Sequence, residues 1–493
     1  MSSLARLGIA VSCAFFLVAG ISTGDLFRNE GLRARLAQEL FLGGSLLVPS
    51  LYGEAHLTKP PGMSLFIALM SWPGGEVTTL TARLPSVVAG LAAILLVGWT
   101  VGRLSGARAG WLAAVMLPIS PLWLDRVPSA EIDLVQLAWV TGAILFFFRA
   151  WDDAQSGSSG WPWWMLAFAC VMGGFFTKWT APAFFYFTIV PFLAMRGQLY
   201  QLRSVPHLTG LLLASLIGSL WLILMVREAG AERVFDTLSR EALLRLSPGH
   251  HPRPYPWDEL VTFPLAFLAG CLPWTFLAIP LFTRNSATKT LTNREQALRE
   301  LALAWVGVSL VFWTLVPGHR PRHILPAQPA VVLLASLVLN GWLDGRLRCF
   351  LPLVKIQPAL VAFVVCWLLV KAVWVGVVVP RRLQDRDLRG EGSRLARLVP
   401  EEATLRLSRL KDEGLLFYYG RSARRCLGSE EVPERESWWL LTGDESRSLP
   451  PSALIVAHLR DGQGQPVVLV RTGAENAGGK NLPWQTASTS SRE

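Results

Sequence analysis

The fold of this chain is decided by residues 207–226, HLTGLLLASLIGSLWLILMV. These twenty residues contain no Asp, Glu, Lys or Arg. At a rise of about 1.5 Å per residue, a helix of this length crosses the hydrocarbon core of a bilayer. The stretch therefore predicts a membrane-spanning helix.

Apolar runs of the same kind recur through most of the chain, although several are shorter than the ~20 residues that a spanning helix needs. The run 7–21 follows Arg6 and could be a cleaved signal peptide, but a retained first helix is preferred because the chain continues to span. The other runs are 82–102, 109–124, 132–149, 162–177, 179–195, 259–282, 301–317, 323–343 and 357–378. The sequence thus predicts an all-α polytopic membrane domain of about eleven helices.

The composition agrees with a membrane protein. Of the 493 residues, 52% are hydrophobic and 16% are charged, whereas soluble proteins carry roughly a quarter charged residues. The net charge of +11 comes from basic residues beside the apolar runs, which favours contact with lipid headgroups over nucleic-acid binding. The six cysteines include no CxxC pair, so neither a disulfide framework nor a cysteine metal site is expected.

The distribution of basic residues predicts the orientation. Alternating spans place the short basic loops on the cytoplasmic side, as the positive-inside rule requires. Loops 22–81 and 227–257 and everything after Val379 then lie outside. The short loops fit the inner membrane of a bacterium. The residues assigned to the cytoplasmic side are Arg103, Arg108, Arg149, Arg196, Arg203, Arg284, Lys289, Arg294, Arg299, Arg346, Arg348 and Lys355.

Composition also divides the chain into domains. Residues 1–378 form the predicted transmembrane domain. Beyond them, short alternating runs at 404–407, 437–441 and 467–470 predict a small α/β domain over residues 379–472 on the periplasmic side. The polar residues 473–493, which are rich in Gly and Ser, are expected to be disordered.

The first outer loop, 22–81, is patterned too strongly to be a simple connector. Its residues 29–42 predict an amphipathic helix in the membrane interface, with Asn29 as the N-cap and Glu30 at the positive end of the helix dipole. Leu32, Leu36 and Leu40 form the apolar face. A second apolar stretch, 63–72, is too short to span and predicts a re-entrant or interfacial helix.

A series of short motifs resembles the C-type membrane glycosyltransferases, which take a sugar from a polyprenyl-phosphate carrier. The resemblance covers nearly the whole chain and is strongest to the lipid A aminoarabinose transferases and the protein O-mannosyltransferases. The motifs are Asn29-Glu30, VPSLYGE (48–54), LTKPPG (57–62), ARLPSVVAG (82–90), EIDL (131–134), FTK (176–178), CLPW (271–274), HILPAQP (323–329) and LFYYGR (416–421). It implies that a polyprenyl-phosphate sugar is the donor and that a lipid, glycan or protein is the acceptor.

A carrier phosphate needs cations at the outer surface. Lys59 and Lys178 lie inside motifs for which the resemblance implies phosphate contact. Further candidates are Arg245, Arg320, Arg322 and His323, although an interfacial Arg more often only extends its charge toward water. His323 stands where the family has an aromatic hydroxyl, and it can still donate a hydrogen bond to a phosphate. Thr58 replaces the acid that the family has before the Lys-Pro pair.

The acceptor needs a carboxylate as its base. The family places an Asp at the start of the first loop helix, whereas this chain has Asn29, which cannot take a proton at neutral pH. Glu30, Asp25 and Asp133 are the remaining candidates; Asp133 could equally be only a helix N-terminal acid. A divalent ion could assist, but no metal-binding residues are assigned, because neighbouring rings such as His250-His251 on a loop more often bind nothing.

Two alternatives to an enzyme remain open at this point. A transporter or flippase for a lipid-linked sugar would carry ionisable residues at mid-membrane depth, and the sequence has few there. A binding protein on a catalytically inactive glycosyltransferase fold would explain Asn29. Transfer assays on variants of Glu30, Asp133 and Lys59 distinguish the enzyme from the inactive relative.

Overall fold

The structure is a computed structural model that describes residues 1–124, 126–246, 257–282, 290–316, 320–347, 353–383, 386–426, 437–448 and 453–473. The side chains of residues 242–246, 321 and 353–355 lie outside this description, as do His250-His251, Cys349 and residues 474–493. The chain forms two compact units, which are described separately. The first contains residues 1–21, 57–63 and 83–376, and the second contains residues 22–56, 64–82 and 377–493.

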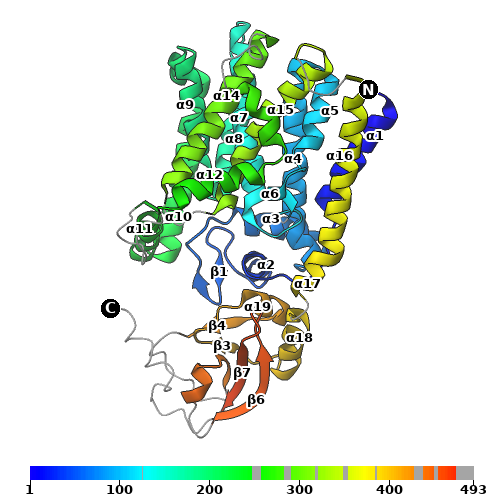
Figure 1. Cartoon of the computed structure of the whole chain (residues 1–493). Helices are drawn as coiled ribbons and strands as arrows, with labels where there is room; N and C mark the ends of the chain where they lie inside the picture. The colour runs from blue at the N-terminus through cyan, green and yellow to red at the C-terminus, as the bar shows by residue number, and fades with distance from the viewer. Residues whose placement is uncertain are drawn as a thin grey trace. The chain divides into compact units, whose positions relative to one another are not determined.

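The first unit is helical (Figure 1). Its helices are α1 (Ser3–Val18), α4 (Thr79–Ser105), α5 (Ala107–Met116), α6 (Pro121–Leu124), α7 (Ile132–Gln155), α8 (Trp161–Thr177), α9 (Ala181–Met195), η2 (Leu199–Arg203), α10 (Val205–Ala229), α11 (Ala231–Leu246), α12 (Glu259–Gly270), α13 (Trp274–Ala278), η4 (Ile279–Leu281), α14 (Asn293–Leu315), η6 (Pro321–Ala327), α15 (Gln328–Leu343), α16 (Leu353–Val373) and η7 (Trp374–Val378). Helix α3 (Gly62–Ser71), followed by η1 (Trp72–Gly74), begins in this unit and continues in the second. The predicted all-α membrane domain is confirmed.

Six helices within the described residues are long and apolar enough to cross a membrane, or seven if the pair α12 and α13 counts as one span. Four shorter apolar helices accompany them, among them α1, α8 and α9. The predicted total of about eleven spans therefore stays a prediction.

Two of the predicted spans are interrupted. The run 109–124 divides into α5 and α6. Pro118 lies between the two helices, and Pro121 is the first residue of α6. The run 259–282 divides into α12 and α13, which meet at 94°. Pro273 stands between them, and a proline inside a helix lacks the N–H that the helical ladder needs. In both cases the apolar run is continuous in the sequence, but the helix that it forms is broken.

The core of the first unit is formed by helices that contact mainly other helices. Helix α7 packs on α8 and α9, α14 packs on α9 and α15, and α15 packs on α5. Small residues permit close approach between α4 and α5: a Cβ atom on Gly110 would stand 2.5 Å from the carbonyl oxygen of Gly98. Helix α15 buries every residue from Gln328 to Gly341, whereas only 6% of the apolar window of α16 is buried.

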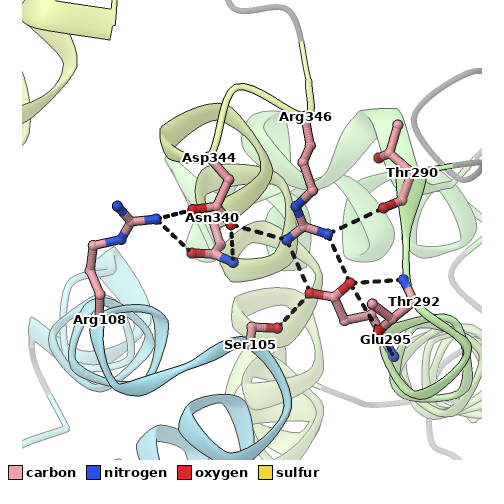
Figure 2. A network of polar contacts seen from close by, with 8 residues as sticks. All are labelled: Ser105, Arg108, Thr290, Thr292, Glu295, Asn340, Asp344 and Arg346. Carbon is pink, nitrogen blue, oxygen red and sulfur yellow. Dashed lines mark hydrogen bonds and ion pairs between the residues drawn. The ribbon is translucent and has the colours of Figure 1, made fainter.

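A network of charged residues ties together several helix ends of the first unit (Figure 2). Thr292 and Glu295 form a capping box at the start of α14. The buried Glu295 carboxylate accepts hydrogen bonds from Arg346 Nη1 (2.9 Å) and Nη2 (3.1 Å), and from the Ser105 hydroxyl (2.7 Å). Arg346 also pairs with Asp344 at the end of α15, and Asp344 pairs with Arg108 of α5. The network connects α4, α5, α14 and α15.

The second unit contains a five-stranded mixed sheet with the order β4-β3-β5-β7-β6. Its strands are β3 (Leu405–Leu407), β4 (Ala423–Arg425), β5 (Ser437–Thr442), β6 (Ala453–Arg460) and β7 (Pro466–Thr472); β3 is parallel to β4 and β5, and the other pairs are antiparallel. The unit also contains α17 (Val379–Leu383), α18 (Leu388–Leu398), α19 (Glu413–Tyr419) and η8 (Glu445–Ser448). The predicted small C-terminal α/β domain is confirmed, while its limits at 379 and 472 stay a prediction.

Most of the first outer loop belongs to this second unit. Helix α2 (Asn29–Phe41) is followed by a hairpin of β1 (Ser50–Leu51) and β2 (Glu54–Ala55). Leu36 and Tyr52 join the apolar core beneath the sheet. The predicted helix is present, but its N-cap is Arg28 rather than Asn29.

The polar side of α2 makes hydrogen bonds to the segment of α19 and the residues that follow it. Arg35 is completely buried and donates hydrogen bonds to the carbonyl oxygens of Leu416 (3.4 Å) and Arg421 (3.0 Å) at α19. Gln38 Nε2 donates to the carbonyl oxygen of Phe417 (3.3 Å). The Leu416 carbonyl also accepts the backbone N–H of Gly420 at the end of α19, so the buried guanidinium adds a second donor there.

Candidate functional site

A buried ion pair lies at the start of α7. Asp133 occupies the first turn of this helix and is 3% exposed, and Lys178 is 5% exposed. Lys178 Nζ stands 3.5 Å from Asp133 Oδ1. The second oxygen, Asp133 Oδ2, is buried and accepts no hydrogen bond from the described residues. The pair therefore leaves one carboxylate oxygen available to a further donor.

The local sequence explains how Lys178 enters the interior. Helix α8 ends at Thr177, and Lys178 adopts extended backbone angles (φ −161°, ψ 123°). Helix α9 starts at Ala181, followed by Pro182, which favours a helix start. The short break between two apolar helices thus turns a lysine toward α7, where Gln136 also donates to the Thr180 hydroxyl (2.8 Å).

A second group of charges surrounds this pair. Glu131, directly before α7, pairs with Arg322 of η6 at 3.1 Å and with Arg126 at 3.5 Å. Both arginines are close enough for their charges to act on Asp133. Three cations therefore face two carboxylates, which leaves a positive excess of one charge. Such an excess in a partly buried site favours an anionic ligand.

His323 lies on the edge of the same group. Its ring centroid is 5.3 Å from that of Trp313. Its Nδ1 accepts a hydrogen bond from the backbone N–H of Arg320 (3.3 Å). This bond leaves Nε2 as the ring nitrogen that can donate. Arg320 itself is exposed.

Lys59 lies in the same unit, but its partner is an acid that the sequence had not indicated. Its Nζ pairs with Glu241 of α11 at 3.1 Å and donates to the carbonyl oxygen of Thr58 (3.0 Å). The motif that carries Lys59 packs on the one that carries Lys178, since a Cβ atom on Gly62 would be 2.5 Å from the carbonyl oxygen of Phe176. The predicted neighbourhood of the two motifs is thus present.

The remaining predicted residues lie elsewhere. Arg245 is in α11, and its side chain lies outside the described residues. Glu30 is in the first turn of α2 in the second unit. Asp25, in the same unit, accepts a hydrogen bond from the backbone N–H of Arg389 (3.1 Å) and pairs with its side chain (3.6 Å). Asp25 therefore ties the first loop to α18.

Three participants were not predicted: Arg126, Glu241 and Lys371. Lys371, near the end of α16, is 2% exposed and donates to the carbonyl oxygens of Leu124 (3.1 Å) and Val127. It thereby holds the segment that carries Arg126. The available signal was a lysine within an apolar helix, a position that a charge occupies only at a cost.

A narrow apolar groove begins beside the ion pair. It contains about 200 Å³ of empty space between α9 and α14. Thr180 and Trp313 connect the groove to the charged group, because Thr180 bonds to Gln136 and Trp313 contacts His323. The other lining residues are Ala183, Phe184, Phe187, Ser309 and Phe312.

A resident metal has no evident ligand set in the described parts of the chain. No three His, Cys, Asp or Glu residues gather there closely enough to hold an ion.

A buried carboxylate beside several cations in a helical membrane unit agrees with the resemblance to the C-type membrane glycosyltransferases. Residues 58–223 match the family model described as dolichyl-phosphate-mannose-protein mannosyltransferase. The predicted resemblance to this class is confirmed.

The similar proteins can be named more particularly. The undecaprenyl phosphate-alpha-4-amino-4-deoxy-L-arabinose arabinosyl transferase of Erwinia tasmaniensis is 27% identical over 326 residues, which are 65% of this chain and 57% of that protein. The protein of the same name from Pseudomonas aeruginosa is 27% identical over 340 residues, 68% of this chain and 58% of that protein. The match thus spans less than three fifths of either relative.

Solved structures support the fold. The crystal structure of ArnT from Cupriavidus metallidurans bound to undecaprenyl phosphate has a TM-score of 0.72 at 18% identity, covering 97% of this chain and 99% of that one. The archaeal oligosaccharyltransferase AglB from Archaeoglobus fulgidus has a TM-score of 0.54 at 11% identity, covering 89% of this chain and 69% of that one. At these identities the likeness establishes the fold.

Proposed function

We propose that the protein transfers a sugar from a polyprenyl-phosphate donor to an acceptor on the periplasmic face of the bacterial inner membrane. The observation that carries this proposal is the buried pair of Asp133 and Lys178, in which Asp133 Oδ2 has no hydrogen-bond donor from the described residues. A polar group buried without a partner is costly, and a substrate hydroxyl would remove that cost. The similar transferases, whose names include undecaprenyl phosphate, support this donor class.

In the proposed reaction, an acceptor hydroxyl attacks the anomeric carbon of the sugar. A bond forms between the acceptor oxygen and this carbon, and the bond from the carbon to the phosphate oxygen breaks. Asp133 accepts the hydroxyl proton as general base. The electron pair of the broken bond stays on the leaving polyprenyl phosphate, which later takes up the proton.

The cations of the site stabilise this leaving group. Lys178 and Arg322 are the proposed principal phosphate ligands, with Arg126 in addition, because preorganised charges are strongest where water is excluded. Lys59 would exchange its partly exposed partner Glu241 for the phosphate. His323 would donate from Nε2.

Arg320 and Arg245 are the two remaining proposed phosphate ligands. Arg320 is exposed, and it directly precedes η6, the element that carries Arg322. We therefore assign it to the first encounter with the donor. Arg245 remains a proposed phosphate ligand on the basis of its sequence position alone.

The apolar groove beside the pair suits the isoprenoid chain of the donor. Its walls are aromatic and aliphatic, and it lies between α9 and α14 next to Thr180. An isoprenoid chain in such a groove removes apolar surface from water or lipid headgroups and positions the phosphate at its end.

Glu30 remains the second candidate for the base. It keeps the acidic position beside Asn29 that the family resemblance implies, and it lies in the positive first turn of α2. We assign Asp25 to the attachment of the loop, because both of its oxygens face Arg389. Because Asn29 cannot take a proton at neutral pH, the proposed proton acceptor is Asp133 or Glu30.

The acceptor is proposed to be a lipid, a glycan or a protein, and lipid A is the first to test because the sequence motifs resemble those of the lipid A aminoarabinose transferases. Residues 1–378 would form the catalytic membrane domain, with loops 22–81 and 227–257 outside. Residues 379–472 would form the periplasmic domain, and 473–493 a disordered tail.

The test is transfer by the purified full-length protein in lipid nanodiscs. Radiolabelled undecaprenyl-phosphate aminoarabinose serves as donor and lipid A as acceptor, with and without a chelator to test the divalent ion. We expect Asp133→Asn to lower kcat by about 10²–10⁴-fold, the usual range for loss of a general base. Lys178→Gln should lower kcat and raise the donor KM together, because it removes a phosphate ligand.

The exposed Asp236→Asn, which removes an acid paired with Arg240 on the same unit, is the matched control and should transfer normally. Normal transfer by Asp133→Asn and loss in Glu30→Gln would move the base to Glu30. Donor binding without transfer by the wild-type protein, with several sugars and acceptors, would establish an inactive binding protein. Movement of labelled donor across the bilayer without transfer would establish a flippase.

A further inference from the structure

A second polar groove lies at the opposite end of α7. Asp133 and Asp152 are nineteen residues apart on this helix, which corresponds to about 28 Å, close to the thickness of a hydrocarbon core. The two ends of α7 therefore meet the two faces of the membrane. The groove holds about 230 Å³ of empty space between α4 and α7.

The groove combines apolar walls with polar groups that have no partner. Leu104, Leu145 and Phe148 form its apolar part. Thr100 lines it, is only 5% exposed, and its hydroxyl makes no hydrogen bond to the described residues. Arg149 also lines it, and its Nε is buried without a hydrogen-bond acceptor in the same part of the chain. Both groups can donate, so the missing partner is an acceptor.

Three arginines make the groove electropositive. Asp152 pairs with Arg294 (3.0 Å), Arg149 (3.2 Å) and, more distantly, Arg103 (3.8 Å). Asp153 pairs with Arg149 at 2.6 Å. Three cations against two carboxylates leave one positive charge in excess, and the long contact of Arg103 leaves its guanidinium the most available.

Tryptophan rings indicate at which level of the membrane the groove lies. Arg103 lies over the Trp99 ring at 5.4 Å, and Arg149 lies over the Trp163 ring at 5.5 Å. Trp99 is 37% exposed and lines the groove. Tryptophan beside arginine is typical of the level at which lipid headgroups meet the hydrocarbon.

We propose that this groove binds the phosphate of an anionic glycerophospholipid in the leaflet opposite the transfer site. The Thr100 hydroxyl, Arg149 Nε and the Arg103 guanidinium donate to the phosphate oxygens, and an acyl chain lies along Leu145 and Phe148. The lipid is a bound constituent and not a substrate. A lipid is preferred to free phosphate because the same groove offers apolar walls.

The experiment is native mass spectrometry of the delipidated full-length protein in detergent, titrated with phosphatidylglycerol or with zwitterionic phosphatidylcholine. We expect phosphatidylglycerol to bind more tightly. Arg103→Gln should weaken its binding about tenfold, the effect of losing one charged hydrogen bond. Thr100→Val, which keeps the shape and removes the hydroxyl, should weaken it about threefold. Arg103→Gln leaves Asp152 with two arginine partners, so the helices keep their ion pairs.

The exposed Arg203→Gln in η2 removes the same charge outside the groove and is the matched control. Equal loss of lipid in Arg203→Gln and Arg103→Gln would overturn the proposal, because binding would then follow total charge alone. Displacement of the lipid by millimolar inorganic phosphate would also overturn it, and would assign the groove to a free anion. Unchanged lipid binding in both Arg103→Gln and Thr100→Val would likewise overturn the proposal.

Discussion

Arg320 and Arg322 are two residues apart, yet their environments differ. Arg322 pairs with Glu131 and is largely covered, whereas Arg320 is exposed. We expect Arg322→Gln to raise the donor KM about tenfold or more, because a buried guanidinium contributes more to anion binding than one in water. Arg320→Gln should change the KM less than threefold. Steady-state transfer kinetics of both variants provide the measurement, and equal effects would contradict the assignment of Arg322 to the phosphate.

Glu413, in the first turn of α19, offers a test by pH. Burial raises the pKa of this carboxyl above its ordinary value of 4.5, and the neighbouring Asp412 raises it further. The folded protein therefore holds the proton more tightly than the unfolded chain, and this group contributes stability that is lost as the pH rises from about 4.5 through the raised pKa. Glu413→Gln should remove that part of the pH dependence.

The measurement is the free energy of opening of α19, obtained from hydrogen exchange at pH 5 and pH 7 after correction for the intrinsic exchange rate. In the wild-type protein the opening free energy should be smaller at pH 7, and in Glu413→Gln the difference should shrink. The exposed Glu232→Gln in α11 is the control, because it lies in the other unit. An unchanged pH difference in Glu413→Gln would refute the buried acid as its source.

Motifs in the sequence singled out Asp133 and Lys178, and their roles stay predictions. The sequence could not pair these two, because they are 45 residues apart and meet only through the break between α8 and α9. Nor could it show that Arg35 of α2 is buried, since periodicity separates two faces of a helix without saying what covers each one. The covering element, α19, is nearly 400 residues away in the chain.

At the scale of elements, the network around Glu295 makes a testable contribution to stability (Figure 2). Glu295 is 2% exposed and forms two hydrogen bonds with Arg346. Glu295→Gln should destabilise the membrane unit by about 3 kcal/mol, because breaking a buried pair leaves an uncompensated charge. Unfolding in SDS, followed by circular dichroism, measures the change.

A double-mutant cycle with Arg346→Gln supplies the control. If the two residues act through one another, the double variant should lose less stability than the two single variants added together. Strict additivity would show that the pair does not couple α14 to the end of α15. Transfer activity should be retained in molecules that remain folded, since the network lies far from Asp133.

The elements themselves were predictable to different degrees. Residues 207–226 predicted α10 correctly, because a long uncharged run has few alternatives in a membrane protein. The division of 109–124 into α5 and α6 was missed, although Pro118 and Pro121 were visible. Hydropathy measures the cost of burial and is insensitive to a lost backbone hydrogen bond, so a broken helix and an intact one give the same signal.

At the scale of the whole molecule, the orientation of the chain is the most direct prediction. We expect Gln463→Cys, exposed in the C-terminal domain, to react with an impermeant maleimide added to intact spheroplasts. Ser158→Cys, exposed between α7 and α8, should react only after the membrane is opened. The wild-type protein is the control, because it shows how much maleimide reacts with the native cysteines. The reverse pattern would place the transfer site on the cytoplasmic side and contradict a periplasmic reaction.

Helix α16 has a consequence for how the protein responds to its bilayer. Only 6% of its apolar window is buried, so one side of the helix faces acyl chains, yet Lys371 anchors it to the carbonyl oxygens of Leu124 and Val127. A thicker or thinner membrane tilts such a peripheral helix at little energetic cost. That tilt pulls on the segment that bears Arg126. If the protein transfers sugar as proposed, turnover should vary with acyl-chain length more in the wild-type protein than in a Lys371→Met variant, which lacks this anchor.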